Sequence, residues 1–206
     1  MTRQQIRVDI VSDVMCPWCI IGYKELETAA AQSGAALGIR WHPFELNPHM
    51  AGDGEDLTDH VTRKYGISPA QSAQNRAALR DRGAALGIDF SFSEGARMRN
   101  SFRAHQLVDW AEDQGAQHRM KLALFAAHFS AGLDVNDIDV LAQVAQTVDL
   151  DAAAAGTAFR LPVAASKESR RCDYGYCWMA FSYCSATLSQ STTSKKASMK
   201  SPRAGP

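Results

Sequence analysis

The chain has 206 residues, of which 46% are hydrophobic and 21% are charged, and its formal net charge is zero. These values are typical of a soluble globular protein, and the length suits one domain or a core domain with an insertion. A neutral chain has no overall field that attracts nucleic acid or an anionic membrane, so we expect neither as a partner.

The first predicted element is a strand over residues 6–11, where apolar and polar residues alternate. A helix is expected over residues 23–31, which hold good helix formers. Between them stands the motif Cys16-Pro17-Trp18-Cys19. With Cys16 at the N-cap and Pro17 at the first helical position, the Cys16 sulfur would face unpaired N–H groups and the positive end of the helix dipole. This position favours thiolate over thiol and predicts a redox-active dithiol.

A Cys-x-x-Cys pair is also half of a structural zinc site, which normally needs a second ligand pair. The first 160 residues contain no comparable pair, and the later cysteines have the wrong spacing: Cys172, Cys177 and Cys184. The six histidines are scattered, without the i, i+4 pair that would place two ligands on one helix face. We therefore favour redox chemistry over a zinc site and expect no metal and no cofactor.

A second strand is predicted over residues 38–44, which completes a βαβ unit with the first strand and the helix. Trp41 and Phe44 are expected to pack on the sheet. Because Phe44 follows the strand, a role in a substrate groove is the alternative interpretation for its side chain.

Residues 57–150 have the pattern of an all-helical segment. One helix is expected to start at Ser68 and Pro69, and Asn100 is a candidate N-cap for another that extends to residue 114. Further helices are predicted over residues 115–130 and 138–148, the second of which starts at Asn136 or Asp137 and carries an apolar stripe.

Several separated segments resemble the DsbA-like class of thioredoxin-fold oxidoreductases, specifically its FrnE-like branch. Cys16-Pro17-Trp18-Cys19 looks like the active-site motif of that branch, and residues 39–48 are similar to its second strand and the following turn. Residues 100–105 and 126–129 are similar to helices of its inserted domain. The resemblance extends over about residues 5–155.

The resemblance implies an α/β, thioredoxin-like fold with an inserted all-helical domain. We expect a βαβ half at residues 1–56, the insertion at 57–150 and an atypical tail at 151–206. It also implies that residues 100–105 face the redox motif, so Asn100 and His105 join Phe44 as candidates for a substrate groove. His105 and His128 are expected as neighbours of the motif without assigned chemistry.

The resemblance ends at the tail. The family completes its sheet with a hairpin, after a loop whose cis proline lies beside the Cys-x-x-Cys, whereas Pro162 comes too soon and the next proline is Pro202. Lys and Arg number 15 against 20 Asp and Glu over residues 1–160, but 7 against 2 over residues 161–206. We expect the hairpin to be missing or degraded and the tail to be partly disordered. A divergent tail is one explanation, and out-of-frame translation is the one we favour.

The motif and the resemblance predict a thiol–disulfide oxidoreductase. Cys16 is the expected nucleophile and Cys19 the resolving thiol, while Pro17 and Trp18 influence the redox potential. The expected partners are protein or small-molecule thiols and disulfides, with glutathione among the candidates. The sequence leaves the direction open, since the same dithiol can oxidise, reduce or isomerise.

Two other functions stay open at this point. Glutathione-dependent isomerases or transferases, of the 2-hydroxychromene-2-carboxylate isomerase or kappa type, share the helical insertion but typically carry a serine at the first motif position. The presence of both Cys16 and Cys19 argues against them. A chaperone-like binder without chemistry is the fallback if the tail abolishes activity.

A cytoplasmic location is expected from three features. No apolar signal segment precedes the first strand, and no apolar run approaches the length of a membrane span. Two of the five cysteines lie in the matched region, and disulfides in the cytosol are rare and usually catalytic or transient.

Overall fold

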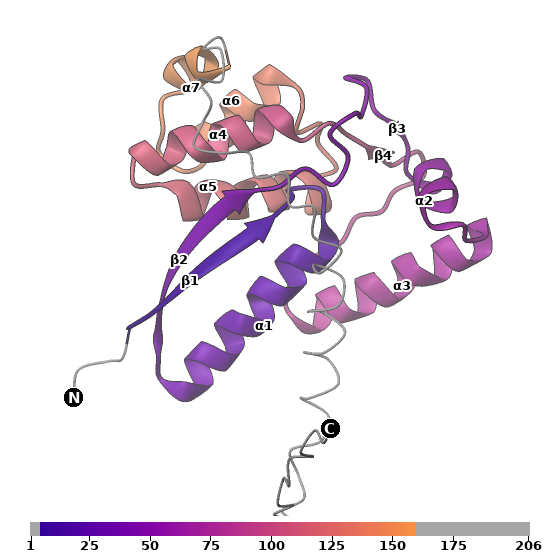
Figure 1. Cartoon of the computed structure of the whole chain (residues 1–206), viewed down its shortest axis with the longest axis horizontal. Helices are drawn as coiled ribbons and strands as arrows, with labels where there is room; N and C mark the ends of the chain where they lie inside the picture. Colours follow the sequence, from indigo (N-terminus) through magenta and orange to yellow (C-terminus); the bar gives the residue numbers. More distant parts are fainter. Residues whose placement is uncertain (1–4, 160–206) are drawn as a thin grey trace, which may run out of the picture. The chain divides into compact units, whose positions relative to one another are not determined.

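A βαβ unit begins the structure, a computed structural model that describes residues 5–159 (Figure 1). Strands β1 (Gln5–Ser12) and β2 (Ala36–Pro43) pair in parallel, with Ile10 opposite Trp41, and helix α1 (Pro17–Ser33) connects them. The predicted strand–helix–strand order is therefore confirmed. The fold is mixed α/β and rich in helix, as predicted.

The segment after β2 is helical apart from a short antiparallel pair of two-residue strands. In chain order its elements are β3 (Glu55–Asp56), α2 (Leu57–Tyr65), α3 (Pro69–Ala85), β4 (Arg97–Met98), α4 (Phe102–Asp113), α5 (Gln117–Phe125), η1 (Ala126–Ser130), α6 (Ile138–Gln146) and α7 (Ala152–Ala158).

The predicted helix starts are confirmed at two positions. Ser68 caps α3 through a reciprocal pair of hydrogen bonds: its hydroxyl accepts from the Gln71 N–H at 3.2 Å, and the Gln71 side chain accepts from the Ser68 N–H at 2.9 Å. Asp137, one of the two candidates, caps α6 by accepting from the N–H groups of Asp139 and Val140.

The predicted N-cap at Asn100 is wrong by one residue. Helix α4 has Ser101 at its N-cap, and the Ser101 side chain makes no capping hydrogen bond. Asn100 still serves the helix start, because its Oδ1 accepts from the Phe102 N–H at 2.9 Å. The short side chain thus satisfies a helical N–H from one position further back.

The helix predicted over residues 115–130 consists of two parts. Helix α5 continues into the π-helical turn η1, where the Ala131 N–H donates to the Ala126 carbonyl at 3.0 Å. The carbonyl of Phe129 in this turn accepts from the Ser91 N–H at 2.7 Å. The wider turn therefore fixes the connection between α3 and β4.

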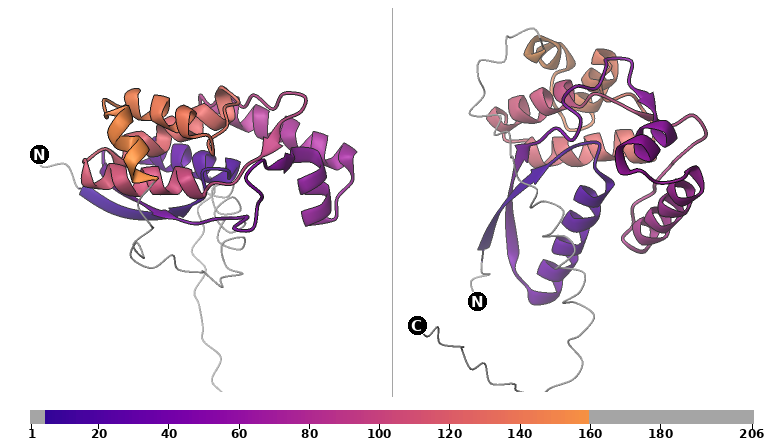
Figure 2. Two further views of the ribbon diagram at one scale, coloured as in Figure 1. Left: turned by 90° about the horizontal axis from the view of Figure 1, so that it is seen from above. Right: turned by 45° about the vertical axis from the view of Figure 1, so that its right-hand side comes forward.

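The core gathers around Trp41, which is 2% exposed. Its ring lies 5.5 Å from that of Tyr23 in α1 and 6.0 Å from that of Phe125 in α5. Helices α1, α4 and α5 all pack against β2, as two directions of view show (Figures 1 and 2). One strand thus links the thioredoxin half to the insertion.

Gly83 sets the distance between α3 and the segment that follows it. A Cβ at this position would lie 2.4 Å from Phe90 Cδ2 and 3.0 Å from the Ile88 carbonyl oxygen. We expect Gly83→Ala to lower the free energy of unfolding by about 2 kcal/mol, because a close-packed site must spread. Thermal unfolding checks this.

The control is Gly156→Ala in α7, where a Cβ would meet nothing within 4 Å. It is expected to stabilise by up to about 1 kcal/mol, through helix propensity alone. Equal melting temperatures for Gly83→Ala and the wild type would contradict the packing argument.

Residues 5–159 lie within one compact unit, Met1–Arg170. The division of the chain at residues 57 and 151 stays a prediction, although the segment assigned to the tail starts with α7. The predictions for Pro162, the three later cysteines, the completing hairpin and an out-of-frame origin fall outside the described residues. In the described part of the chain, no helix is long and apolar enough to cross a membrane.

Candidate active site

Cys16 and Cys19 lie where β1 gives way to α1. Cys16 is the N-cap residue, with φ −95° and ψ 109°, and Pro17 is the first residue of the helix. The Cys16 side chain makes no capping hydrogen bond, and the Cys19 N–H donates to the Cys16 carbonyl at 3.1 Å. The backbone N–H groups of Trp18 and Cys19 nevertheless help to lower the pKa of the Cys16 thiol. The predicted placement at a helix N-terminus is therefore confirmed, and the positive end of the helix dipole lies at the Cys16 position.

The two thiols differ in pKa, so that one is more readily deprotonated than the other. A hydrogen bond from the Cys19 thiol, together with backbone N–H groups, holds the pKa of Cys16 below its ordinary value, although burial and Asp13 oppose this. The same hydrogen bond, with burial, raises the pKa of Cys19 well above its ordinary value. Both thiols are free in this structure. The arrangement favours a Cys16 thiolate that accepts from a Cys19 thiol.

Asp13 holds the backbone on either side of the motif through hydrogen bonds. Its side chain is 1% exposed and accepts from the Met15 N–H at 3.0 Å and from the Leu46 N–H at 2.6 Å. The Asp13 carbonyl accepts from the Cys16 N–H at 3.3 Å. Burial alone would raise the pKa of Asp13, but His105 and the two backbone donors outweigh it and lower the pKa. A single carboxylate thus joins the segment before Cys16 to the segment after β2.

His105 and Phe44 lie close to Asp13. His105 Nε2 is 3.5 Å from Asp13 Oδ1, and the backbone of Phe44 also faces the imidazole. The ring is 5% exposed, and burial, the largest cause, lowers its pKa. His105 is therefore a neutral group beneath the motif, and its burial argues against the expected place in an open groove. Phe44 is half-buried, and its groove role stays a prediction.

The hydrogen bonds of the Asn100 side chain are to backbone groups outside the Cys-x-x-Cys motif. Its Nδ2 donates to the Met50 carbonyl at 2.9 Å, while its Oδ1 serves the start of α4. Asn100 thus joins the loop after β2 to the insertion. Its expected role in substrate binding stays a prediction.

Lys121 is a functional candidate that the sequence did not reveal. It belongs to α5, is 1% exposed, and donates from Nζ to the Ser12 carbonyl at 3.2 Å. Nζ lies 5.1 Å from the centre of the Phe125 ring and 5.6 Å from that of Trp41. Burial lowers the pKa of Lys121 to about 8, while Asp13 and the two cysteines oppose this shift. The sequence pattern that could have revealed its burial is its position three residues before Leu124, which places both on the same apolar side of the helix.

Two residues at the end of α2 complete the surroundings of Cys16. Lys64 and Tyr65 both lie within electrostatic reach of its sulfur. Lys64 Nζ is held by the Leu46 carbonyl at 3.0 Å and by Asn47 Oδ1 at 2.6 Å. Tyr65 is 54% exposed, and Trp18 of the motif is 45% exposed. Lys64 and Tyr65, about 50 positions from Cys16 in the sequence, thus join Trp18 in the surroundings of the thiolate, and only Trp18 was evident from the sequence.

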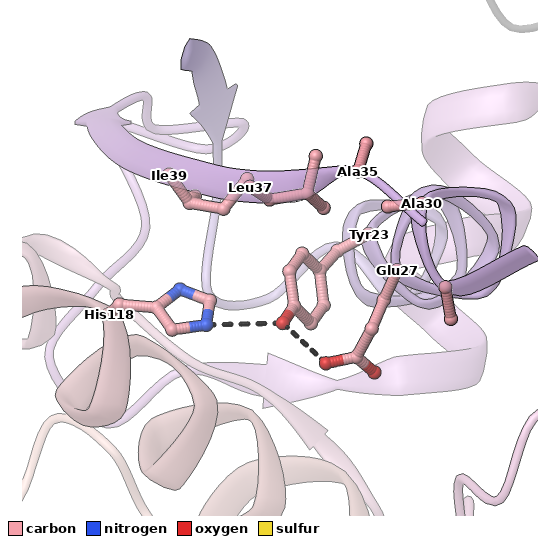
Figure 3. A pocket seen from close by; sticks show the side chains of 8 residues that line it. Tyr23, Glu27, Ala30, Ala35, Leu37, Ile39 and His118 are labelled. Atoms are coloured by element: carbon pink, nitrogen blue, oxygen red, sulfur yellow. Dashed lines mark hydrogen bonds between the residues drawn. The ribbon is translucent and has the colours of Figure 1, made fainter. Parts of the chain in front are cut away.

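A second polar arrangement lies along α1, β2 and α5 (Figure 3). The Trp41 Nε1–H donates to His118 Nδ1 at 2.9 Å, so His118 carries its proton on Nε2, which lies 3.1 Å from the Tyr23 hydroxyl. That hydroxyl donates to Glu27 at 2.8 Å. These hydrogen-bonded side chains border an open cavity of about 540 Å³, and the rest of its lining is apolar, including Leu37 and Ile39. The hydrogen bonds tie the insertion to the thioredoxin half.

The described residues contain no group of three or more His, Cys, Asp or Glu side chains placed to hold a metal ion. The six histidines lie apart, and those near the motif contact a carboxylate, a backbone group or a ring. His128 is buried, which lowers its pKa to about 4, and its ring lies 4.6 Å from that of Phe129.

Comparison with known proteins supplies the family. The model of the DSBA-like thioredoxin domain matches residues 7–173. The chain belongs to this family. This match confirms the DsbA-like resemblance seen in the sequence.

Two relatives share sequence similarity with this chain. The chain is 24% identical over 148 residues to the uncharacterized protein YwbO of Bacillus subtilis. The aligned region covers 72% of this chain and 68% of YwbO. It is 28% identical to a probable DsbA oxidoreductase of Streptomyces coelicolor, with a TM-score of 0.71 over 80% of this chain and 71% of the other.

More distant structures share the fold. The cytosolic disulfide reductase DsbM of Pseudomonas aeruginosa is 18% identical, with a TM-score of 0.54 over 88% of this chain and 80% of DsbM. A 2-hydroxychromene-2-carboxylate isomerase is also 18% identical, with a TM-score of 0.55 over 79% of this chain and 75% of the isomerase.

Proposed function

We propose that this DSBA-like protein is a thiol–disulfide oxidoreductase in which Cys16 is the nucleophile and Cys19 resolves the intermediate. The observation that carries the proposal is the paired thiol site at the start of α1, where the pKa of Cys16 is lowered and that of Cys19 is raised. Only the thiolate attacks a disulfide, and the lowered pKa of Cys16 favours this form for the first step. The raised pKa of Cys19 keeps its thiol protonated until the mixed disulfide has formed.

The geometry supports a two-step exchange. The Cys16 thiolate attacks one sulfur of a substrate disulfide, which forms a mixed disulfide and releases the other sulfur as a thiolate. Cys19 then loses its proton and attacks the Cys16 sulfur, so that the Cys16–Cys19 disulfide forms and the second substrate thiol leaves with that proton. The reverse sequence oxidises a substrate dithiol, and the potential of the couple decides the direction.

Replacement of the resolving thiol tests the proposal. We expect Cys19→Ser to accumulate a mixed disulfide with glutathione or with a substrate protein, because the first step remains and the second is lost. Mass spectrometry under non-reducing conditions detects the adduct, and dithiothreitol should release it. Wild-type turnover of disulfides by Cys19→Ser would contradict the assignment.

A glutathione-dependent isomerase or transferase is the alternative, and the fold shared with 2-hydroxychromene-2-carboxylate isomerase supports keeping it. Such an enzyme needs one reactive group at the start of α1 and has no use for a second thiol. Conjugation or isomerisation that survives Cys19→Ser would favour this alternative. Loss of all thiol chemistry with retained suppression of aggregation would instead favour a chaperone-like binder.

Glutathione is the small-molecule partner that we propose. A second structure of DsbM, solved with glutathione, supports this proposal. Lys64 beside Cys16 gives a specific expectation, because glutathione disulfide carries net negative charge. Lys64→Gln should slow oxidation of the reduced protein by glutathione disulfide about threefold at low salt, and less at high salt, where charges are screened. Stopped-flow fluorescence measures this rate.

Two comparisons sharpen that measurement. The rate with an uncharged disulfide, hydroxyethyl disulfide, should change less than the rate with glutathione disulfide. Arg63→Gln is the matched control, since Arg63 precedes Lys64 on α2 but pairs with Glu55 at 2.7 Å. Equal slowing by both variants would show that general surface charge is responsible.

We also propose a cytoplasmic location, which the cytosolic DsbM neighbour supports. Placement in the FrnE-like branch is a further proposal within the family. Fractionation of cells that express the protein from its own gene tests the location.

A further inference from the structure

Lys121 is a buried cation beneath a site whose charge depends on its redox state. Its Nζ has one hydrogen bond, to the Ser12 carbonyl, and otherwise faces the rings of Trp41 and Phe125. Within residues 5–159 no carboxylate lies at ion-pair distance from this ammonium group. A buried charge without a contact partner is costly, so the charge state of Lys121 should respond to its surroundings.

Four titratable groups face Lys121 from the elements around it. Asp13 lies in the segment after β1, Cys16 and Cys19 belong to the start of α1, and His105 belongs to α4. Asp13 stays ionised in both redox states because its pKa is lowered, and burial keeps His105 neutral. Among these groups, only the cysteines change charge when the dithiol is oxidised.

We propose that Lys121 is the redox-linked proton site of the dithiol, which binds a proton when the Cys16–Cys19 disulfide is reduced and releases it when the disulfide forms. The inference rests on the proposed function. On reduction by an external dithiol, the S–S bond breaks and accepts two electrons, and two protons are taken up. Cys19 takes one proton, Lys121 takes the other, and Cys16 remains a thiolate. The reductant becomes a disulfide.

The physical cause is the field of the thiolate. In the reduced form, negative charge on the cysteines opposes the effect of burial and helps to keep the pKa of Lys121 at about 8. Disulfide formation removes that charge, while burial and Asp13 stay the same, so the pKa of Lys121 must fall. The coupling is reciprocal, and the ammonium group therefore stabilises the reduced dithiol in return.

The test is the pH dependence of the reduction potential, measured by equilibration of the full chain with dithiothreitol redox buffers. The potential is measured from about pH 6 to about pH 8, and the proton bound by Cys16 at each pH is determined from thiolate absorbance in each variant and subtracted. One proton per two electrons gives a tenfold change in the equilibrium constant per pH unit, or about 29.6 mV. After this subtraction, we expect the wild-type slope to approach about 59 mV about one pH unit below the pKa of Lys121 and to fall toward about 29.6 mV at higher pH, whereas Lys121→Met should keep about 29.6 mV throughout.

Lys64→Met is the matched control, because it removes a cation near Cys16 from an exposed site. It should shift the potential and keep the wild-type slope. Equal slopes for Lys121→Met and the wild type would overturn the inference.

A measurement on the wild type alone remains decisive if Lys121→Met does not fold. Reduction of the disulfide in weakly buffered solution at about pH 7, followed with a pH indicator, should take up clearly more than one proton per disulfide after the proton bound by Cys16, known from thiolate absorbance, is subtracted. Uptake of one proton would overturn the inference. Failure of Cys16 and Cys19 to form a disulfide at any potential would refute the proposed function instead.

Discussion

Cys16→Ser is expected to lower the rate of disulfide exchange at least about a thousandfold, which corresponds to about 4 kcal/mol of lost transition-state stabilisation. The N–H groups of Trp18 and Cys19 and the Cys19 thiol together stabilise a thiolate at this position. A serine hydroxyl stays protonated at this position, and it forms no disulfide with Cys19. The measurement is reduction of insulin disulfides by dithiothreitol with the variant as catalyst.

Two observations separate the loss of chemistry from the loss of fold. Circular dichroism and the melting temperature of Cys16→Ser should match those of the wild type, because serine retains the N-cap position and is itself a good N-cap residue. In the wild type, alkylation of Cys16 should persist below the ordinary thiol pKa of about 8.5 and fall tenfold per pH unit below the pKa of Cys16. Residual exchange within tenfold of the wild type would refute the assignment of the nucleophile.

Asp13→Asn is expected to have the largest effect on stability, a loss of about 3 kcal/mol. Asp13 is buried and accepts hydrogen bonds from Met15 and Leu46, and an amide presents an N–H group to one of these donors. Leaving a buried donor unpaired costs about 1–3 kcal/mol, and the buried Lys121 also loses a neighbouring negative charge. For a chain of this size the melting temperature should fall by about 6–12 °C.

The pH dependence gives this prediction a sign. The folded pKa of Asp13 is lowered, so its contribution to stability is present above its unfolded pKa, about 3.9, and is lost as the pH falls through the lower, folded pKa. The difference between the wild type and Asp13→Asn should therefore be largest near neutral pH and shrink below about pH 4. Denaturant unfolding at several pH values measures it.

Asp9→Asn is the control for Asp13→Asn. Asp9 is also a carboxylate of the β1 region with a histidine partner, His42, at 2.6 Å, but its side chain is 66% exposed. An exposed pair of this kind contributes about 0.5 kcal/mol. Comparable losses of stability in the two variants would show that burial of Asp13 is not the cause.

The sequence was informative wherever the decisive interactions are local. The placement of Cys16 at an N-cap follows from Pro17 and the neighbouring pattern, because capping involves only adjacent residues. The start of α3 at Ser68 follows for the same reason. The displaced cap at Asn100 shows the limit, because its side chain also donates to the Met50 carbonyl, a contact across 50 residues that no local pattern predicts.

The surroundings of the dithiol were not accessible in the same way. Lys121 donates to Ser12 across 109 residues, and no local pattern encodes that contact. A lysine in a helix is normally interpreted as a solvent-exposed residue. Asp13 stands in the quoted motif region but resembles an ordinary loop residue until its bond to Leu46 is seen, 33 positions away.

The hydrogen-bond chain from Trp41 through His118 and Tyr23 to Glu27 also fixes a distance that matters for the sulfurs. His118 and Lys121 are three residues apart on α5, so they lie on neighbouring positions of one helix surface. By anchoring α5 to α1, these hydrogen bonds help to set the distance between the Lys121 ammonium group and the dithiol. Under the proposed coupling, the reduction potential of the dithiol therefore depends on Tyr23, four residues after Cys19 on α1.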